Sequence, residues 1–105
     1  MVSVNGKGGP KRMVTGRELF DHGTVVGDHD SARVCEKHKL SPLVLTAMHV
    51  SGIWGDVSPE HAAANEAGLK TGGPIMSVYT FGRDKIIIVT NAERTGTLIM
   101  GELSE

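Results

Sequence analysis

Seven polar side chains of the kinds found in active and binding sites are spread over residues 49–97 of the chain. They are His49, Asn65, Ser77, Tyr79, Thr90, Arg94 and Thr97. Ser77 and Tyr79 share one face of an expected strand, because residues i and i+2 point to the same side. Asn65 interrupts an alanine-rich helix, where a polar side chain needs a buried partner or water. The sequence therefore indicates a polar cluster that joins the helices to a sheet.

Trp54 follows His49 closely and is the only tryptophan. Glycines at positions 52 and 55 leave its indole free to fold over a neighbour. One interpretation makes His49 a helix-end histidine and Trp54 an aromatic plug. The other makes both part of a binding site, whose residues are then His49, Trp54, Asn65, Ser77, Tyr79, Thr90 and Arg94.

A catalytic alternative uses four residues of the cluster. In small metal-independent ribonucleases of the toxin type, a histidine moves the 2′-hydroxyl proton and an arginine steadies the charge on phosphorus. The residues for these roles are His49 as base, Arg94 as anion clamp, and Tyr79 and Thr97 as hydrogen-bond donors. RNA-cutting domains usually carry a basic face, whereas this chain has 11 lysines and arginines against 12 acids. We therefore expect binding, with RNA cleavage as the alternative.

Two other groups of reactive side chains are not interpreted as sites. Acids and histidines gather within ten residues, at Asp21, His22, Asp28, His29 and Asp30. Their ligand atoms suit zinc or manganese, but their spacing matches no helix face, so a solvated loop is expected. Cys35 has His38 three residues later but no third group to orient the pair. We expect a structural cysteine, no metal site and no cofactor.

Length and composition fit one small domain. The chain has 105 residues, of which 39% are hydrophobic and 22% charged, with a net charge of −1; these values are typical of soluble globular domains. No apolar run approaches the ~20 residues that span a bilayer, and the start lacks an apolar signal core. The single cysteine fits a reducing compartment. We expect a cytoplasmic protein without membrane contact.

The first segment differs from the rest in charge. Its charged residues are Lys7, Lys11, Arg12 and Arg17. Glycines and Pro10 oppose regular structure there, so we expect a flexible basic arm over residues 1–12 and a single α+β domain over residues 13–105. If the chain contacts nucleic acid, these four cations are the expected contacts.

Helix signals are strongest at two Ser-Pro pairs, residues 41–42 and 58–59. Each places an N-cap hydroxyl before a proline at the first helical position. A weaker helix, capped by Asp30 or Ser31, precedes them. The expected helices cover residues 31–39, 42–50 and 59–70.

Strands follow the helices, and a short apolar run at residues 24–26 allows one more before them. Gly82 stands first in a two-residue turn that joins the first two strands of a meander. The expected strands of the meander cover residues 75–81, 85–90 and 95–101. The predicted fold is α+β, with two or three short helices followed by a three-stranded antiparallel β-meander.

The middle strand is apolar on both sides. Ile86 and Ile88 point one way, and Ile87 and Val89 point the other. Two helices cover only one face, and four exposed aliphatic side chains would lose roughly 6–12 kcal/mol of burial, at 1.5–3 kcal/mol each. The second face therefore needs a cover: residues 24–26, the helix after Ser41, or another protomer. We expect a homo-oligomer.

The pattern also resembles a family of small phage- and plasmid-borne proteins of unassigned function. Its motifs in this chain are His49-x-Ser51-Gly52-x-Trp54-Gly55-Asp56, then Asn65, Gly72-Gly73, Ile75-x-Ser77-x-Tyr79, and Thr90, Arg94 and Thr97. Ile53 departs from the family pattern, which has an acid there, and Asn91 and Glu93 stand where it has Glu and Asp. The resemblance implies a mobile-element origin and a role in host takeover or counter-defence, with a host or defence protein as partner. We expect a self-associating binding module of this kind.

Overall fold

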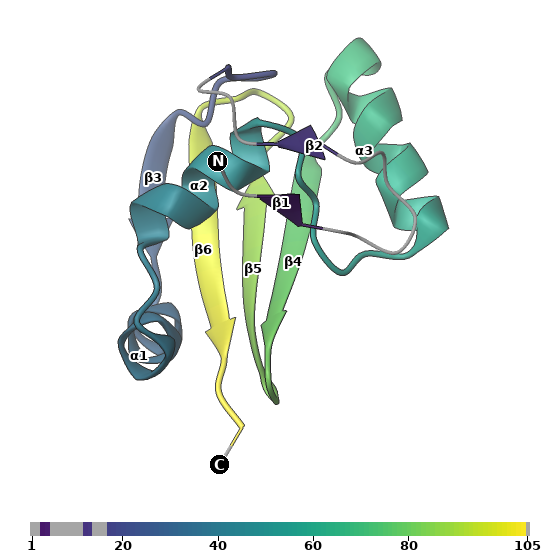
Figure 1. The fold of residues 1–105 in the computed structure, drawn as a ribbon. Helices are drawn as coiled ribbons and strands as arrows, with labels where there is room; N and C mark the ends of the chain where they lie inside the picture. The colour runs from purple at the N-terminus through teal and green to yellow at the C-terminus, as the bar shows by residue number, and fades with distance from the viewer. Residues whose placement is uncertain (1–2, 5–11, 14–16, 105) are drawn as a thin grey trace.

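The computed structural model describes residues 3–4, 12–13 and 17–104 of the chain. Between residues 24 and 102 the elements follow one another as β3 (Thr24–Gly27), α1 (His29–His38), α2 (Pro42–Val50), α3 (Pro59–Thr71), β4 (Ile75–Phe81), β5 (Asp84–Thr90) and β6 (Gly96–Glu102). Figure 1 shows the three helices leading into the long strands of one sheet. The predicted α+β class is confirmed. Within the described residues, no helix is both long and apolar enough to cross a membrane.

Local signals set most of the helix ends. The Ser41 and Ser58 hydroxyls accept hydrogen bonds from backbone N–H groups three residues later, and a proline follows each serine. Gly72 ends α3 in the left-handed conformation at φ 84°. The predicted cap of α1 is wrong, because Asp28 is the N-cap and its carboxylate accepts from the backbone N–H of Ser31. Asp28 has the extended backbone that an N-cap requires.

The sheet has four strands in the order β3-β6-β5-β4 and is mixed, so the prediction of a three-stranded antiparallel meander is corrected. β4, β5 and β6 form the expected meander, and Gly82 begins its first turn at φ 64°. β3 adds a parallel strand at the outer edge of β6, pairing Thr24 with Gly96. A three-residue apolar run indicates a strand but not its partner, because pairing is decided by residues far along the chain.

The predicted arm is described only in part. β1 (Ser3–Val4) and β2 (Arg12–Met13) pair as two antiparallel strands of two residues each. Lys7 and Lys11 lie outside the described residues, and so does most of the segment 1–12 for which flexibility is predicted.

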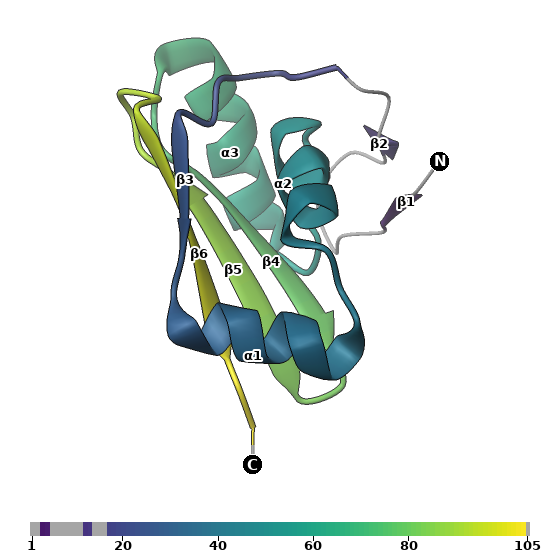
Figure 2. The ribbon, with the colours of Figure 1, turned by 90° about the vertical axis from the view of Figure 1, so that its left-hand side faces the viewer.

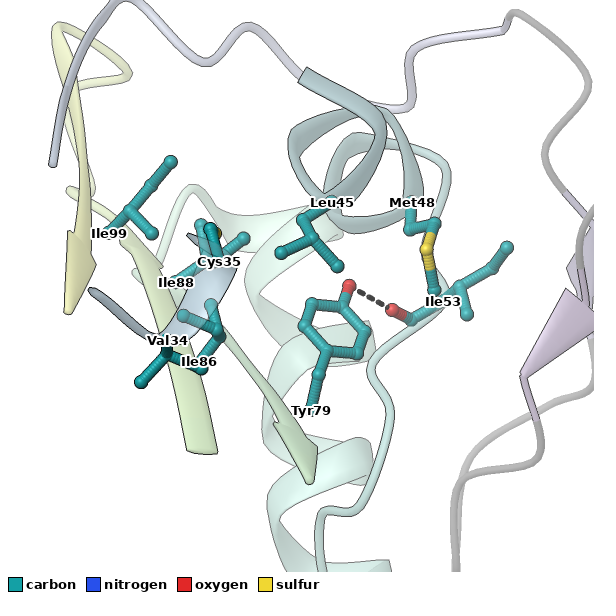
Figure 3. Close-up of a cluster of buried hydrophobic side chains, with 9 residues drawn as sticks. All are labelled: Val34, Cys35, Leu45, Met48, Ile53, Tyr79, Ile86, Ile88 and Ile99. Carbon is teal, nitrogen blue, oxygen red and sulfur yellow. Dashed lines mark hydrogen bonds between the residues drawn. The ribbon is translucent and has the colours of Figure 1, made fainter. Parts of the chain in front are cut away.

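The main core lies between the helices and one face of the sheet. Figure 2 shows α1 crossing in front of the lower part of the strands and α2 to the right of them, and buried side chains of both helices belong to one core. The side chains that meet there come from α1, α2, the loop after α2 and three strands, as Figure 3 shows: Val34, Cys35, Leu45, Met48, Ile53, Tyr79, Ile86, Ile88 and Ile99. Helix α1 approaches β6 so closely that a Cβ on Gly101 would lie 2.4 Å from backbone atoms of Asp30 and Ser31. Only glycine fits this position without moving the helix.

The opposite face of the sheet carries seven apolar side chains, and we call it the open face: Val26, Met76, Val78, Ile87, Val89, Leu98 and Met100. Val78 packs against the cluster of Trp54 and Val57 at the margin. Val26 and Leu98 remain 56% and 41% exposed, and the others are half-buried. The buried side chains of α1 and α2 pack on the other side of the sheet, in the core with Ile86, Ile88 and Ile99.

Neither segment expected as an intramolecular lid covers the open face. Residues 24–26 lie within the sheet as part of β3, and α2 packs on the core face through Leu45 and Met48. Both of these proposed covers are therefore wrong, and the third one, another protomer, stays a prediction.

Candidate functional site

His49, at the end of α2, is fully buried and bonded through both ring nitrogens. Its Nδ1 lies 2.6 Å from the Ser77 hydroxyl on β4, and its Nε2 lies 2.9 Å from the Thr90 hydroxyl on β5. The Thr90 hydroxyl in turn lies 2.6 Å from that of Thr97 on β6. We call Ser77, His49, Thr90 and Thr97 the His49 network; it ties one helix to three strands.

The direction of every hydrogen bond in the His49 network follows from its last member. The Thr97 hydroxyl donates to the carbonyl oxygen of His22 at 2.7 Å, so it accepts from Thr90. Thr90 has thereby used its proton and accepts from the Nε2–H of His49. Nδ1 of a neutral imidazole is then an acceptor, and Ser77 donates to it.

The imidazole is held in its neutral form. Burial is the main reason that the pKa of His49 falls to about 3, and the charges of Arg94 and His22 lower the pKa further. A charged ring would also need to donate from both nitrogens. The His49 network therefore holds one tautomer.

Aromatic rings enclose His49. Phe20 meets it edge to face with ring centres 5.1 Å apart, and Trp54 lies 6.3 Å away. The indole N–H of Trp54 donates to the carboxylate of Glu66 on α3 at 3.0 Å. Trp54 thus packs beside the His49 ring and fastens the loop after α2 to α3.

Tyr79 and Asn65 each hold a backbone segment in place. The buried Tyr79 hydroxyl donates to the Ile53 carbonyl at 2.6 Å, and burial raises its pKa (Figure 3). The Asn65 side chain pairs with both backbone groups of Met76, donating at 2.8 Å and accepting at 3.1 Å. Asn65 therefore has the buried partner that a polar residue at its position in α3 is expected to need.

Arg94 binds backbone carbonyls rather than an open site. Its guanidinium donates to the carbonyls of Gly68, Gly73 and Asn91 and lies 5.3 Å from the centre of the Phe20 ring. Gly68 belongs to the last turn of α3, where a cation complements the helix dipole. Arg94 thus fastens the end of α3 to the turn between β5 and β6.

The predicted polar side chains therefore meet as a set of structural contacts. His49, Ser77, Thr90 and Thr97 form one network, whereas Tyr79, Asn65 and Arg94 each serve a different backbone segment. Catalysis of RNA cleavage needs a base within hydrogen-bond reach of the 2′-hydroxyl. His49 has no exposed surface for such a contact.

The acidic and histidine-rich segment takes up structural roles. Asp28 caps α1, and the Asp21 carboxylate accepts from the backbone N–H of Gly23. Over the part of the chain that the structure describes, no three His, Cys, Asp or Glu side chains are placed to hold a metal ion. Cys35 is buried in the core, and burial raises the pKa of its thiol.

Sequence reasoning missed Asp84, the first residue of β5. Its side chain is 1% exposed, and it accepts from Lys37 at 2.8 Å, from His38 at 2.6 Å and from the backbone N–H of Ser104 at 2.8 Å. The Lys37 and His38 contacts hold the pKa of the Asp84 carboxyl well below its usual range. Residues i and i+2 share a strand face, so the alignment of Asp84 with Ile86 and Ile88 was the signal for a buried acid.

No family model, curated protein or solved structure matches this chain.

Proposed function

We propose that the protein is a small interaction module that binds through the open face of its sheet and self-associates there. The observation that carries the proposal is two adjacent rows of apolar side chains outside the covered core. The first row runs across all four strands and the second across three: Met76, Val89, Leu98 and Val26, then Val78, Ile87 and Met100. Contiguous apolar surface of this kind marks an interaction site.

Polar residues bound the apolar rows at both ends of the sheet. Thr80, Lys85 and Glu102 form the next row toward the β4–β5 turn, and all three are exposed. Thr24 and Asn91 are exposed at the opposite end. An apolar centre with a polar rim is the usual anatomy of a protein–protein interface.

The chemistry-bearing residues support binding over catalysis. The His49 network is buried, its hydrogen bonds are satisfied, and the neutral ring is shielded by Phe20 and Trp54. No contact of His49 or Arg94 favours the ribonuclease alternative. We infer that the protein acts through shape and apolar surface.

The resemblance to phage- and plasmid-borne proteins extends the proposal to host takeover or counter-defence in the host cytoplasm. A host or defence protein would then compete with self-association for the open face. Nucleic-acid binding through Lys7, Lys11, Arg12 and Arg17 is a separate hypothesis. Removal of residues 1–12 without loss of DNA affinity would exclude it.

Sedimentation equilibrium on the full chain tests self-association. We expect wild type to dimerise and Leu98→Glu to be monomeric, because the substitution places a charge within the apolar rows. Leu43→Glu is the matched control: Leu43 is 80% exposed on α2, away from the open face. We expect this control to dimerise like wild type.

Two results would contradict the proposal. One is a wild-type mass equal to the monomer at every concentration up to the millimolar range. The other is dissociation by Leu43→Glu but not by Leu98→Glu, which would place the interface on α2. Circular dichroism of each variant shows whether its fold is intact.

A further inference from the structure

The open face is complementary to itself, and we propose that two copies pack face to face about a twofold axis that runs along the strands between β5 and β6. This inference rests on the proposed function and adds to it the partner and its orientation. The occupant of the open face is the same face of a second copy. The partner also contributes charged residues to the rim, so the interaction site is complete only in the pair.

The strand order places the proposed axis at the middle of the sheet. β6 and β5 are the two central strands, with β3 and β4 outside them. The proposed axis lies in the plane of the interface and runs midway between β6 and β5. A rotation of 180° about it places β5 of one copy over β6 of the other copy, and β4 over β3 of the other copy. Because the axis follows the strands, each row of side chains meets the same row of the second copy.

The apolar rows match under this rotation. Val89 then faces Leu98 of the partner subunit, and Ile87 faces Met100 of the partner subunit, each pair occurring twice. Aligned packing of two sheets about 10 Å apart allows such side chains to interdigitate. A closed pair of this kind is isologous, so it uses up both patches and leaves none for further growth.

Charges at one end of the open face distinguish this orientation from the others. Lys85 and Glu102 are register partners on the two central strands, and both are exposed. Neither forms an ion pair with another described residue. The rotation places Lys85 over Glu102 of the partner subunit, and the reverse, which gives two ion pairs at the rim. An axis across the strands would instead place both charges over the end that carries Thr24 and Asn91.

The size of the face predicts a weak dimer. Three strands of seven residues and one of four, about 4.8 Å apart and rising about 3.4 Å per residue, cover roughly 410 Å² in plan. Two such faces contribute roughly 820 Å², below the ~1,200 Å² at which specific stable interfaces begin and in the range of weak, transient ones. We therefore expect a dissociation constant in the micromolar range. In this range, changes in dimer affinity caused by charge substitutions at the rim can be measured.

Charge exchange between two variants tests the orientation. In Lys85→Glu, two acidic side chains face each other in each pair, and in Glu102→Lys two basic ones do. We expect each single variant to dimerise about tenfold or more weakly than wild type, because like charges across an interface are unfavourable. An equimolar mixture of the two restores opposite charges at both positions. We expect the mixture to form heterodimers with nearly wild-type affinity.

The mixture separates contacts between copies from contacts within one copy. Each variant keeps its own like-charge pair on neighbouring strands in the mixture, so recovery of mass in sedimentation equilibrium reports only the intermolecular pairs. Thr80→Lys, in the same row but outside the two central strands, is the control for a general effect of added charge. We expect it to weaken association less than Lys85→Glu does.

The outcomes distinguish this inference from the proposed function. If wild type dimerises but the mixture stays as weak as its components, the proposed axis is wrong and self-association through the open face stands. If wild type is monomeric at every concentration, both proposals fail. Recovery in the mixture at low salt that declines at high salt supports the rim ion pairs.

Discussion

The two faces of the sheet carry different kinds of side chain and have different roles. The covered face carries hydroxyls and a carboxylate next to isoleucines and contacts the His49 imidazole of α2, and each of these polar groups has a partner. The open face holds aliphatic side chains and methionines, without a described helix over its centre. The polar residues that the sequence offers as candidate site residues therefore stabilise the fold, and the aliphatic residues of the open face form the proposed binding surface.

This difference shows how a residue type can mislead about function. A histidine next to a serine at 2.6 Å has the geometry of a catalytic pair. Burial removes its access to substrate and holds it neutral. In a domain this small, one polar network can instead specify how a helix sits on a sheet.

The largest expected effect comes from breaking the covered face at its centre. His49→Ala leaves the hydroxyls of Ser77 and Thr90 without their partner and opens a cavity between α2 and the sheet. We expect a loss of about 4 kcal/mol in the free energy of unfolding. Urea denaturation measures it. His29→Ala, at an exposed histidine, should change stability by no more than about 0.5 kcal/mol; equal losses in both variants would contradict the assigned role.

Two glycines of β6 allow a direct comparison of the faces. A Cβ on Gly101 would meet the backbone of α1 at 2.4 Å, whereas a Cβ on Gly96 would meet only the Thr24 carbonyl at 3.7 Å. We expect Gly101→Ala to cost about 3 kcal/mol and Gly96→Ala to be close to neutral. Thermal denaturation of the two variants checks this. Similar melting temperatures would show that α1 does not pack tightly at this position.

A smaller expected effect is the dependence of the free energy of unfolding on pH. The folded pKa of His49, about 3, lies below its unfolded value of 6.5, so the unfolded chain binds the extra proton. Stability is therefore full above pH 6.5 and declines as the pH falls toward 3. At about 1.4 kcal/mol per pH unit, the loss between pH 7.5 and pH 5 is about 2 kcal/mol.

The matched variant for the pH dependence is His49→Gln, which cannot be protonated. Between pH 7.5 and pH 5, the free energy of unfolding of this variant should not show the decrease that protonation of His49 causes in wild type. The Asp84 carboxyl does not interfere, because its lowered pKa causes a loss of stability only as the pH falls through the unfolded value of 3.8 and below. Parallel pH profiles for wild type and variant would exclude His49 as the source.

Local chemistry explains which parts of the fold were predictable. The Ser41 and Ser58 caps, the Gly72 helix end and the Gly82 turn each depend on a few adjacent residues, and the structure has them where the sequence places them. The pairing of β3 with β6 depends on residues far apart, so composition and periodicity did not contain it. The cap of α1 was misplaced because three polar residues, Asp28, Asp30 and Ser31, compete within four positions.

The candidate site shows the same division. Strand alternation placed Ser77 and Tyr79 on one face, and the meeting of Ser77 with His49 was predictable, whereas Tyr79 bonds the Ile53 carbonyl instead. Burial was not, because it depends on how Phe20 and Trp54 close over the ring. The carbonyl partners of Arg94 were also beyond prediction, since they come from the end of α3 and the segment after it.

The parallel pairing of β3 with β6 has a consequence for the order in which the protein is made. Thr24 pairs with Gly96, which lies 72 residues further along the chain (96 − 24). A nascent polypeptide can form its helices and the β4–β5 hairpin early, but β3 has no partner in the sheet until β6 has been made. Closure of so long a loop is a slow, late event, and a chain interrupted before Gly96 would expose unsatisfied backbone on both β3 and β5.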